Sequence, residues 1–397
     1  DKQVENNREA VASLNDEVLE TIEGVRVARA YSKKTTQKEQ FQLRTKALSK
    51  VGDQIASIQY LYAPLSSVFI ALSTIIVLLI GAIFIKMGQL TIGQVIALQL
   101  YMISLIEPFW MLSDFILVYQ TGKTSFKKVT ELIETTDDMK MSGKEELKHL
   151  ISIRFQNYHF TYPQTKRPSL RNIAWQIEAG KTYGIVGKTG SGKTTLVRQL
   201  LQQYPVGRGT FQINGKSVSH YSRPSIEAMI GYVPQEHILF SKSVKDNIAF
   251  GKRNATLSDI EKAIKTAAFS EDLKRMPDGL ETLIGERGVS ISGGQKQRIS
   301  LARAFIRQPE VLILDDSLSA VDAQTERRII KNLQDMRANQ TTIIVTHRLS
   351  AIQQADWVLV LEDGQIVEEG TPNQLLNKGG WYAEQYQRQQ HQRGGSK

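Results

Sequence analysis

The sequence contains no cysteine in its 397 residues. Disulfide bonds, thiolate metal sites and a cysteine nucleophile are therefore excluded, and the composition fits a domain that faces a reducing cytosol. The N-terminus also lacks a charged start followed by an apolar run and a cleavage site. We therefore expect the hydrophobic segments further along to belong to the mature protein rather than to a signal peptide.

Charge is absent from a long stretch near the N-terminus, although the whole chain carries a net charge of +10. No charged residue occurs from Gln54 to Ile85, and a second apolar run extends from Ile92 to about Leu112. A helix that crosses a membrane needs about 20 apolar residues. We therefore expect two membrane helices, over about 58–85 and 92–118. A buried helical hairpin of a soluble protein is the alternative, which the length of the charge-free run disfavours.

Basic residues flank the two apolar runs. They cluster between residues 33 and 50 and again between 123 and 128, whereas the turn between the runs carries only Lys86. The positive-inside rule then places both outer ends in the cytoplasm and Lys86 outside. The other basic residues are spread along the chain, so the pI near 9.4 is expected to reflect membrane-flanking charge and not a nucleic-acid partner.

The sequence pattern changes near residue 150. Residues 124–150 are polar and mixed in charge, and we interpret them as a helix end and a linker. Short strand-like runs then alternate with helical and turn segments, which indicates an α/β domain over residues 151–384. The polar, low-complexity residues 385–397 are expected not to fold. The strand-like runs are Ile151–Phe155, Thr182–Val186, Phe211–Asn214, Val311–Leu314, Thr342–Thr346 and Trp357–Leu361.

A glycine-rich loop lies between a predicted strand and a predicted helix. Its spacing, Gly-x-x-x-x-Gly-Lys-Thr, is that of a P-loop, and the strand-loop-helix context disfavours an ordinary glycine turn. Backbone N–H groups in such a loop turn toward phosphates, Lys193 reaches the β- and γ-oxygens, and the Thr194 hydroxyl binds Mg²⁺. We therefore predict an ATP site whose contacts are Gly187, Lys188, Thr189, Gly190, Ser191, Gly192, Lys193, Thr194 and Thr195.

A carboxylate at the end of another apolar run suits the same site. The run Val311–Leu314 ends in Asp315, as a Mg²⁺ site opposite a P-loop requires. A buried strand followed by a polar turn is the plainer interpretation. The segment Ile291–Arg298 favours the metal site, because it reads Ile-Ser-Gly-Gly-Gln-Lys-Gln-Arg and closely resembles the signature motif of ABC ATPases.

The remaining motifs of the ABC family stand in the expected order. Tyr162 resembles the aromatic A-loop residue that stacks on adenine, and Gln235 resembles the Q-loop glutamine, with catalytic and Mg²⁺-binding roles. Asp322 ends a segment that resembles the D-loop, and His347 resembles the catalytic switch histidine. Each residue taken singly would more often be structural. The resemblance also implies that the nucleotide is contacted by Ser292, Gly293, Gly294, Gln295 and Asp322.

Two further segments resemble the exporter branch of the family. Thr282–Gly288 resembles the exporter loop that contacts the intracellular loops, and Glu23–Tyr31 resembles the second intracellular loop, with its coupling helix. The implied fold is an α-helical transmembrane segment, in residues 1–123, followed by an α/β P-loop NTPase domain of the ABC type, with a RecA-like core and a helical subdomain. A family subunit has six membrane helices, and the two here resemble the fifth and sixth, so the sequence is expected to be partial.

One position departs from the family pattern. A glutamate normally follows the aspartate that corresponds to Asp315, and it polarises the attacking water. Asp316 stands there instead, in a segment that resembles the degenerate subunit of bacterial heterodimeric multidrug exporters. The resemblance therefore implies a catalytic position that is weakened in this chain, with a different half-transporter as partner. An aspartate that serves adequately as the base, in a homodimer, is the alternative.

The resemblance implies ATP-driven export of multidrug or amphiphilic small molecules. The cofactors would be ATP and Mg²⁺, and the partners a second half-transporter, membrane lipid and the transported molecule. The protein would lie in the plasma membrane with a cytoplasmic nucleotide-binding domain. Exporters of lipid or peptide use the same machinery and remain an alternative, as does, less favoured, a nucleic-acid-associated ABC ATPase. Glu107, in the second apolar run, is expected to contribute to a pathway for cationic amphiphiles. The alternative is that Glu107 and Asp114 both lie in the solvated inner extension of this helix.

Overall fold

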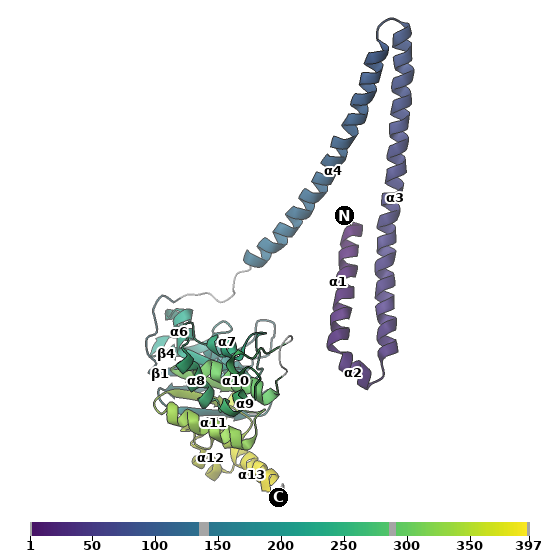
Figure 1. The fold of residues 1–397 in the computed structure, drawn as a ribbon. Helices are drawn as coiled ribbons and strands as arrows, with labels where there is room; N and C mark the ends of the chain where they lie inside the picture. Colours follow the sequence, from purple (N-terminus) through teal and green to yellow (C-terminus); the bar gives the residue numbers. More distant parts are fainter. Residues whose placement is uncertain (1, 135–142, 286–290, 395–397) are drawn as a thin grey trace. The chain divides into compact units, whose positions relative to one another are not determined.

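The computed structural model describes residues 2–134, 143–285 and 291–394. The chain divides into two compact units, Asp1–Thr135 and Thr136–Lys397. Figure 1 shows the first unit as helices alone and the second as sheets covered by helices.

Two long helices dominate the first unit (Figure 1). Within them, Pro64–Lys86 and Ile92–Glu134 are long and apolar enough to cross a membrane, where the sequence predicts spans over about 58–85 and 92–118. The second helix also continues beyond the predicted domain boundary at residue 123, because Phe126, Val129 and Ile133 keep a helical spacing. The helices are α1 (Lys2–Glu23), α2 (Val25–Ala30), α3 (Lys34–Lys86) and α4 (Ile92–Glu134).

Close packing and a polar contact between Gln99 and Thr74 join α3 to α4. Gly81 faces Val95 so closely that an added Cβ would lie 2.6 Å from the Val95 Cγ1 atom. Gln99 donates a hydrogen bond of 3.0 Å to the Thr74 hydroxyl. Small residues and interhelical hydrogen bonds are the usual contacts between membrane helices. The short helix α2 lies within Glu23–Tyr31, the segment that resembles an intracellular loop.

The second unit contains two sheets. The larger has the strand order β10-β9-β3-β8-β7-β6, with parallel pairing from β9 to β6 and an antiparallel edge strand, β10. The smaller is antiparallel, in the order β2-β1-β4-β5. The strands are β1 (Ser152–Phe160), β2 (Leu170–Glu178), β3 (Thr182–Gly187), β4 (Arg208–Ile213), β5 (Lys216–Ser217), β6 (Ile230–Val233), β7 (Val311–Asp315), β8 (Thr341–Val345), β9 (Trp357–Glu362) and β10 (Gln365–Gly370).

Helices cover the parallel sheet and build a helical subdomain, as the predicted ABC-type architecture requires. A buried apolar cluster joins α7, α8 and α10 to the strands β7 and β8. The strands β3, β7 and β8 are almost wholly buried, which explains their continuous apolar sequences. The helices are α5 (Lys193–Leu200), α6 (Arg223–Met229), α7 (Val244–Ala249), α8 (Leu257–Thr266), α9 (Ser270–Lys274), α10 (Gly293–Phe305), α11 (Ala323–Met336), α12 (Pro372–Lys378) and α13 (Trp381–Gly394), with short 3₁₀ turns η1 (Val218–His220), η2 (Gly279–Glu281) and η3 (Leu349–Ile352).

The C-terminal region differs from the sequence prediction. Residues 385–397 were expected not to fold, yet α13 continues to Gly394. The composition misleads because a few side chains anchor the helix: Tyr382 is fully buried, and Tyr386 packs against the same core. Glutamine and arginine then favour the helical state over the remaining turns.

An aromatic stack holds the smaller sheet together. The ring of Phe155 lies 4.4 Å from that of Phe211 and 6.3 Å from that of Trp175, both nearly parallel to it. Phe155 is only 2% exposed. Such pairs stabilise a core beyond the area that they bury.

We expect Phe155→Ala to destabilise the second unit by about 3 to 5 kcal/mol, because it removes a buried ring and leaves a cavity. Thermal unfolding of the full chain, followed by tryptophan fluorescence, measures the effect. Ile151→Ala, at a side chain that is 70% exposed beside the same strand, is the control and should change stability little. Equal effects of the two substitutions would contradict the packing argument.

Candidate functional site

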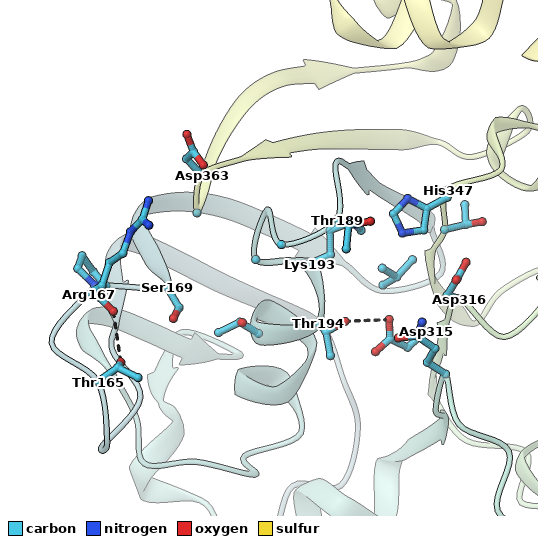
Figure 2. Close-up of a pocket in the computed structure, with 18 residues that line it drawn as sticks. Thr165, Arg167, Ser169, Thr189, Lys193, Thr194, Asp315, Asp316, His347 and Asp363 are labelled. Carbon is cyan, nitrogen blue, oxygen red and sulfur yellow. Dashed lines mark hydrogen bonds between the residues drawn. The ribbon is translucent and has the colours of Figure 1, made fainter. Parts of the chain in front are cut away.

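A pocket of about 530 Å³ lies at the carboxyl ends of the parallel strands, the usual ligand position in such sheets. Its walls come from the P-loop, the ends of β7 and β8, and three other loops, at residues 165–169, at Gln235 and at residues 363–364 (Figure 2). Among the predicted site residues, the lining includes Thr189, Gly190, Gly192, Lys193, Thr194, Thr195, Gln235, Asp315, Asp316 and His347.

The P-loop has a conformation that only glycine tolerates at two positions. Gly187 has a φ of 147°, and a Cβ there would lie 2.1 Å from the Leu361 carbonyl oxygen. Gly192, at the N-terminus of α5, has a φ of 102°. A loop without side chains at these points lets backbone N–H groups and the helix terminus face an anion.

Lys193 lies inside this loop and is only 7% exposed. Its ammonium group donates to the carbonyl oxygens of Gly187 at 2.8 Å and Lys188 at 2.7 Å. Burial lowers the pKa of the Lys193 ammonium, and the nearby Asp316 and Asp315 carboxylates oppose that shift. The buried hydroxyl of Ser191 has no hydrogen-bond partner among the described residues. A buried cation and an unpaired hydroxyl together fit a phosphate ligand.

Asp315 lies opposite Lys193 at the end of β7. Its carboxylate accepts hydrogen bonds from the Thr194 hydroxyl at 3.5 Å and the Tyr232 hydroxyl at 3.3 Å. Burial raises the pKa of the Asp315 carboxyl, which means that its anion gains from a nearby cation. Figure 2 shows Thr194 and Asp315 facing each other across the pocket floor. This set of hard oxygen atoms fits Mg²⁺.

Asp316 and His347 complete this end of the pocket (Figure 2). Asp316 has a φ of 46°, the left-handed region, where aspartate is among the better tolerated residues. Its backbone N–H donates to the Val345 carbonyl at 2.8 Å, which ties the end of β7 to β8. Burial lowers the pKa of the His347 imidazole, and Lys193 adds to the effect, so a neutral imidazole is favoured near neutral pH.

Tyr162 does not line the pocket but lies behind its wall. Its hydroxyl donates to the Thr195 hydroxyl at 3.1 Å, and the Arg198 guanidinium donates to Tyr162 at 3.4 Å. Its ring packs edge-on against Tyr204, at 4.9 Å between centroids. The tyrosine is thus oriented by Thr195 and Arg198 of α5, the helix that carries Lys193.

The signature segment lies elsewhere in the unit and is not part of the described lining of this pocket. Ser292 caps α10: its hydroxyl accepts from the Gln295 N–H, and the Gln295 side chain accepts from the Ser292 N–H at 2.9 Å. Gly293 and Gly294 form the first turn of this helix. The Gln295 side chain is therefore used locally, while the helix N-terminus remains a position that suits an anion.

Asp322 and Lys188 also have structural partners. The Asp322 carboxylate caps α11 by accepting from Gln324 and Thr325, which holds its pKa at about 2. The Lys188 side chain pairs with Glu362 at 2.8 Å, which leaves its backbone for any phosphate contact. The end of the exporter-like loop, residues 286–288, lies outside the described residues.

Several residues that line the pocket were not predicted from the sequence. They are Thr165, Arg167, Pro168, Ser169, Val345, Thr346, Asp363 and Gly364. The last two form the turn between β9 and β10, which lies far from the P-loop in sequence but bonds to it: the Gly364 N–H donates to the Ser191 carbonyl at 3.0 Å. The Asp-Gly pair signals a turn, but nothing local connects that turn to the site.

Two family models match the chain, "ABC transporter transmembrane region" over residues 2–109 and "ABC transporter" over residues 170–319. The chain is also 44% identical, over 96% of its length, to "Probable multidrug resistance ABC transporter ATP-binding/permease protein YheI" of Bacillus subtilis (strain 168). The chain belongs to the ABC transporters. The predicted fold and ATP-binding domain are thereby confirmed, and this ABC transporter is a membrane protein with a cytoplasmic ATP-binding domain.

Other relatives of this ABC transporter carry different names. It is 32% identical, over 96% of its length, to "Multidrug resistance-like ATP-binding protein MdlA" of Escherichia coli (strain K12), and 32% identical, over the same share, to "ATP-dependent lipid A-core flippase" of Photobacterium profundum. The chain spans 65% of the length of each of these relatives and of YheI.

A solved structure titled "Structure of a bacterial Atm1-family ABC exporter with ATP bound" has the same fold. It matches 98% of this ABC transporter chain and 69% of its own, with a TM-score of 0.88 and 27% identity.

We expect Tyr162→Ala to weaken ATP binding by about 1 to 2 kcal/mol through lost stacking on the base. Tyr162→Phe, which keeps the ring and loses the hydrogen bond to Thr195, should weaken it less. Equilibrium binding of a fluorescent ATP analogue to the purified transporter measures both. Lys193→Ala removes the buried ammonium group, and its loss of ATP affinity shows the effect of lost phosphate contacts for comparison. Unchanged binding in Tyr162→Ala and Lys193→Ala would reject this site.

Proposed function

We propose that this chain is part of an exporter that uses ATP to move amphiphilic small molecules across the membrane. The supporting observation is the pocket that gathers Lys193, Thr194, Asp315 and His347 from separate elements, in a chain that also carries a membrane region. The names of YheI and MdlA favour multidrug substrates, whereas the lipid A-core flippase keeps a lipid substrate as a second candidate.

The active unit in this proposal is a dimer. Ser292 and its neighbours do not belong to the described lining of their own chain's pocket, although the N-terminus of α10 suits a phosphate. A second half-transporter would bring its signature to this pocket and receive this chain's signature in return. Closure of the pair around ATP would then bias the membrane helices toward one state, since a ligand favours the state that binds it better.

The P-loop, Asp315, Asp316, Gln235 and His347 each have a role in this proposal. Bound Mg²⁺·ATP supplies the phosphoanhydride bond that water cleaves, with the metal neutralising charge on the β- and γ-oxygens. Lys193 and the P-loop N–H groups would hold the phosphates, and Thr194, Asp315 and Gln235 would hold the metal. His347 would orient a hydrogen bond to the terminal phosphate. Asp316 would accept a proton from the attacking water.

Asp316 makes the dimer asymmetric in this proposal. An aspartate carboxylate is withdrawn by about 1.5 Å relative to that of glutamate, one C–C bond. A misplacement of about 1 Å can cost on the order of a hundredfold in rate. This chain's own site would then bind ATP and turn it over slowly, and its signature would complete the faster site of a different partner.

We expect Gly294→Asp to stop nearly all ATP turnover in the assembled transporter, because it places a carboxylate where the partner's phosphate would bind. Asp316→Asn should leave most turnover intact. Steady-state phosphate release measures both variants. Loss of nearly all activity in Asp316→Asn would make Asp316 the working base and favour a homodimer.

The membrane unit supports a pathway for amphiphiles. A pocket of about 470 Å³ between α3 and α4 is lined by Leu65, Ser66, Phe69, Ile70, Ile106, Phe109 and Trp110. Glu107 lies within the same stretch of α4, beside Pro108. Glu107 is not among the lining residues, but it follows Ile106 directly in the sequence. An acidic group close to an apolar, aromatic lining suits a ligand with a cationic head and a hydrophobic body.

We expect Glu107→Gln in the full-length transporter to slow the export of a cationic dye and to leave that of a neutral dye unchanged, since only the cation loses its counter-charge. Dye efflux from proteoliposomes measures both rates. Asp114→Gln, at another acidic position seven residues along α4, is the control. An unaltered rate for the cationic dye in Glu107→Gln would reject this pathway.

A further inference from the structure

The C-terminal helix contacts the loop that carries His347. Gln389, on α13, makes two hydrogen bonds to this loop through one side chain. Its Oε1 atom accepts from the Leu349 N–H at 3.0 Å, and its Nε2 donates to the His347 carbonyl at 2.8 Å. The amide of Gln389 thus bridges the backbone on both sides of Arg348.

The helix that supplies Gln389 is itself anchored. Tyr382 is fully buried, and Trp381 and Tyr386 pack against the same core. The Trp381 N–H donates to the Glu368 carboxylate at 2.5 Å, at the start of the helix. Gln389 is therefore presented from a fixed element, and its two hydrogen bonds can restrain the loop.

The side chain of Arg348 also holds this loop. Its guanidinium donates to the Val321 carbonyl at 3.0 Å and the Ser319 carbonyl at 2.5 Å, and pairs with Glu326 at 2.8 Å. Glu326 is only 1% exposed, so this pair is costly to break. Gln389 therefore fixes the backbone of His347 and Leu349, and the contacts of Arg348 fix the side chain between them. The His347 imidazole in this loop lines the pocket.

We propose that Gln389 is a positioning residue for His347, so that the C-terminal helix sets the geometry of the nucleotide site. The inference rests on the proposed role of His347 toward ATP. A purely structural role is the competing explanation, because Leu349 begins the short helix η3 and the Gln389 Oε1 atom satisfies a free N–H at its start.

Gln389→Glu separates the two roles. Glutamate keeps an acceptor for the Leu349 N–H but cannot donate to the His347 carbonyl. If Gln389 only caps η3, Gln389→Glu should behave as the parent protein. If Gln389 positions His347, Gln389→Glu and Gln389→Ala should both be impaired. Gln390→Ala, at the neighbouring exposed residue of α13, is the matched control.

The test measures hydrogen exchange and ATP turnover in the full-length transporter. Gln389→Ala should speed exchange of the backbone amides between His347 and Leu349 about tenfold, because the Leu349 N–H loses its partner. Turnover is compared in an Asp316→Glu background, where this chain's own site has the longer carboxylate. In that background, Asp316→Glu is expected to add turnover, and Gln389→Ala or Gln389→Glu should lower this added turnover about 3- to 10-fold. The KM for ATP should stay within about twofold of that of Asp316→Glu alone.

Three results would overturn the proposal: unchanged exchange in Gln389→Ala, unchanged turnover despite faster exchange, or normal turnover in Gln389→Glu beside a loss in Gln389→Ala. The proposed weakness of Asp316 is tested separately by whether Asp316→Glu itself raises turnover. If it does not, that weakness is rejected, and the Gln389 variants are compared in the parent background with the same expected fall.

Discussion

The candidate nucleotide site depends on a close approach between backbone segments that leaves no room for side chains. A Cβ on Gly364 would lie 2.5 Å from the Ser169 carbonyl oxygen, and one on Gly192 would lie 3.0 Å from the same atom. The start of β2, the P-loop and the turn between β9 and β10 therefore meet at one point. This contact fixes the N-terminus of α5, and with it Lys193 and Thr194. Glycine at these positions is a steric requirement and a condition for the site.

The sequence predicts the P-loop and the strand that ends in Asp315 well because each is a local pattern. The P-loop and the strand ending in Asp315 are each encoded within a few consecutive residues, and the structure brings them to one pocket. Buried parallel strands also have a strong signal, since both faces are apolar. Strand β6, at four residues, and strand β10, with exposed side chains alternating along it, are too short or too polar for such a signal.

Other parts of the site could not be predicted because they arise from tertiary contacts. The segment from Gln385 onward has a composition typical of unfolded chain, yet Tyr386 and Gln389 give it partners that no local pattern reveals. The sequence also does not reveal the contribution of Arg348, which follows His347 directly, because its guanidinium bonds to the carbonyl oxygens of Ser319 and Val321 in a loop that is distant in sequence. Tyr162 and Asp322 were recognised by motif, but their hydrogen bonds to Thr195 and to the start of α11 required the structure.

The left-handed backbone at Asp316 links this residue to the loop that carries His347. Aspartate tolerates a φ of 46° better than a longer side chain, and its neighbours are constrained: the Asp316 carbonyl accepts from the Ser319 hydroxyl at 2.9 Å. Ser319 in turn provides a carbonyl to Arg348, which follows His347. Asp316 and the loop that carries His347 therefore share one hydrogen-bonded framework. We therefore expect a substitution at residue 316 to act both on the reach of the carboxylate and on the backbone that supports His347.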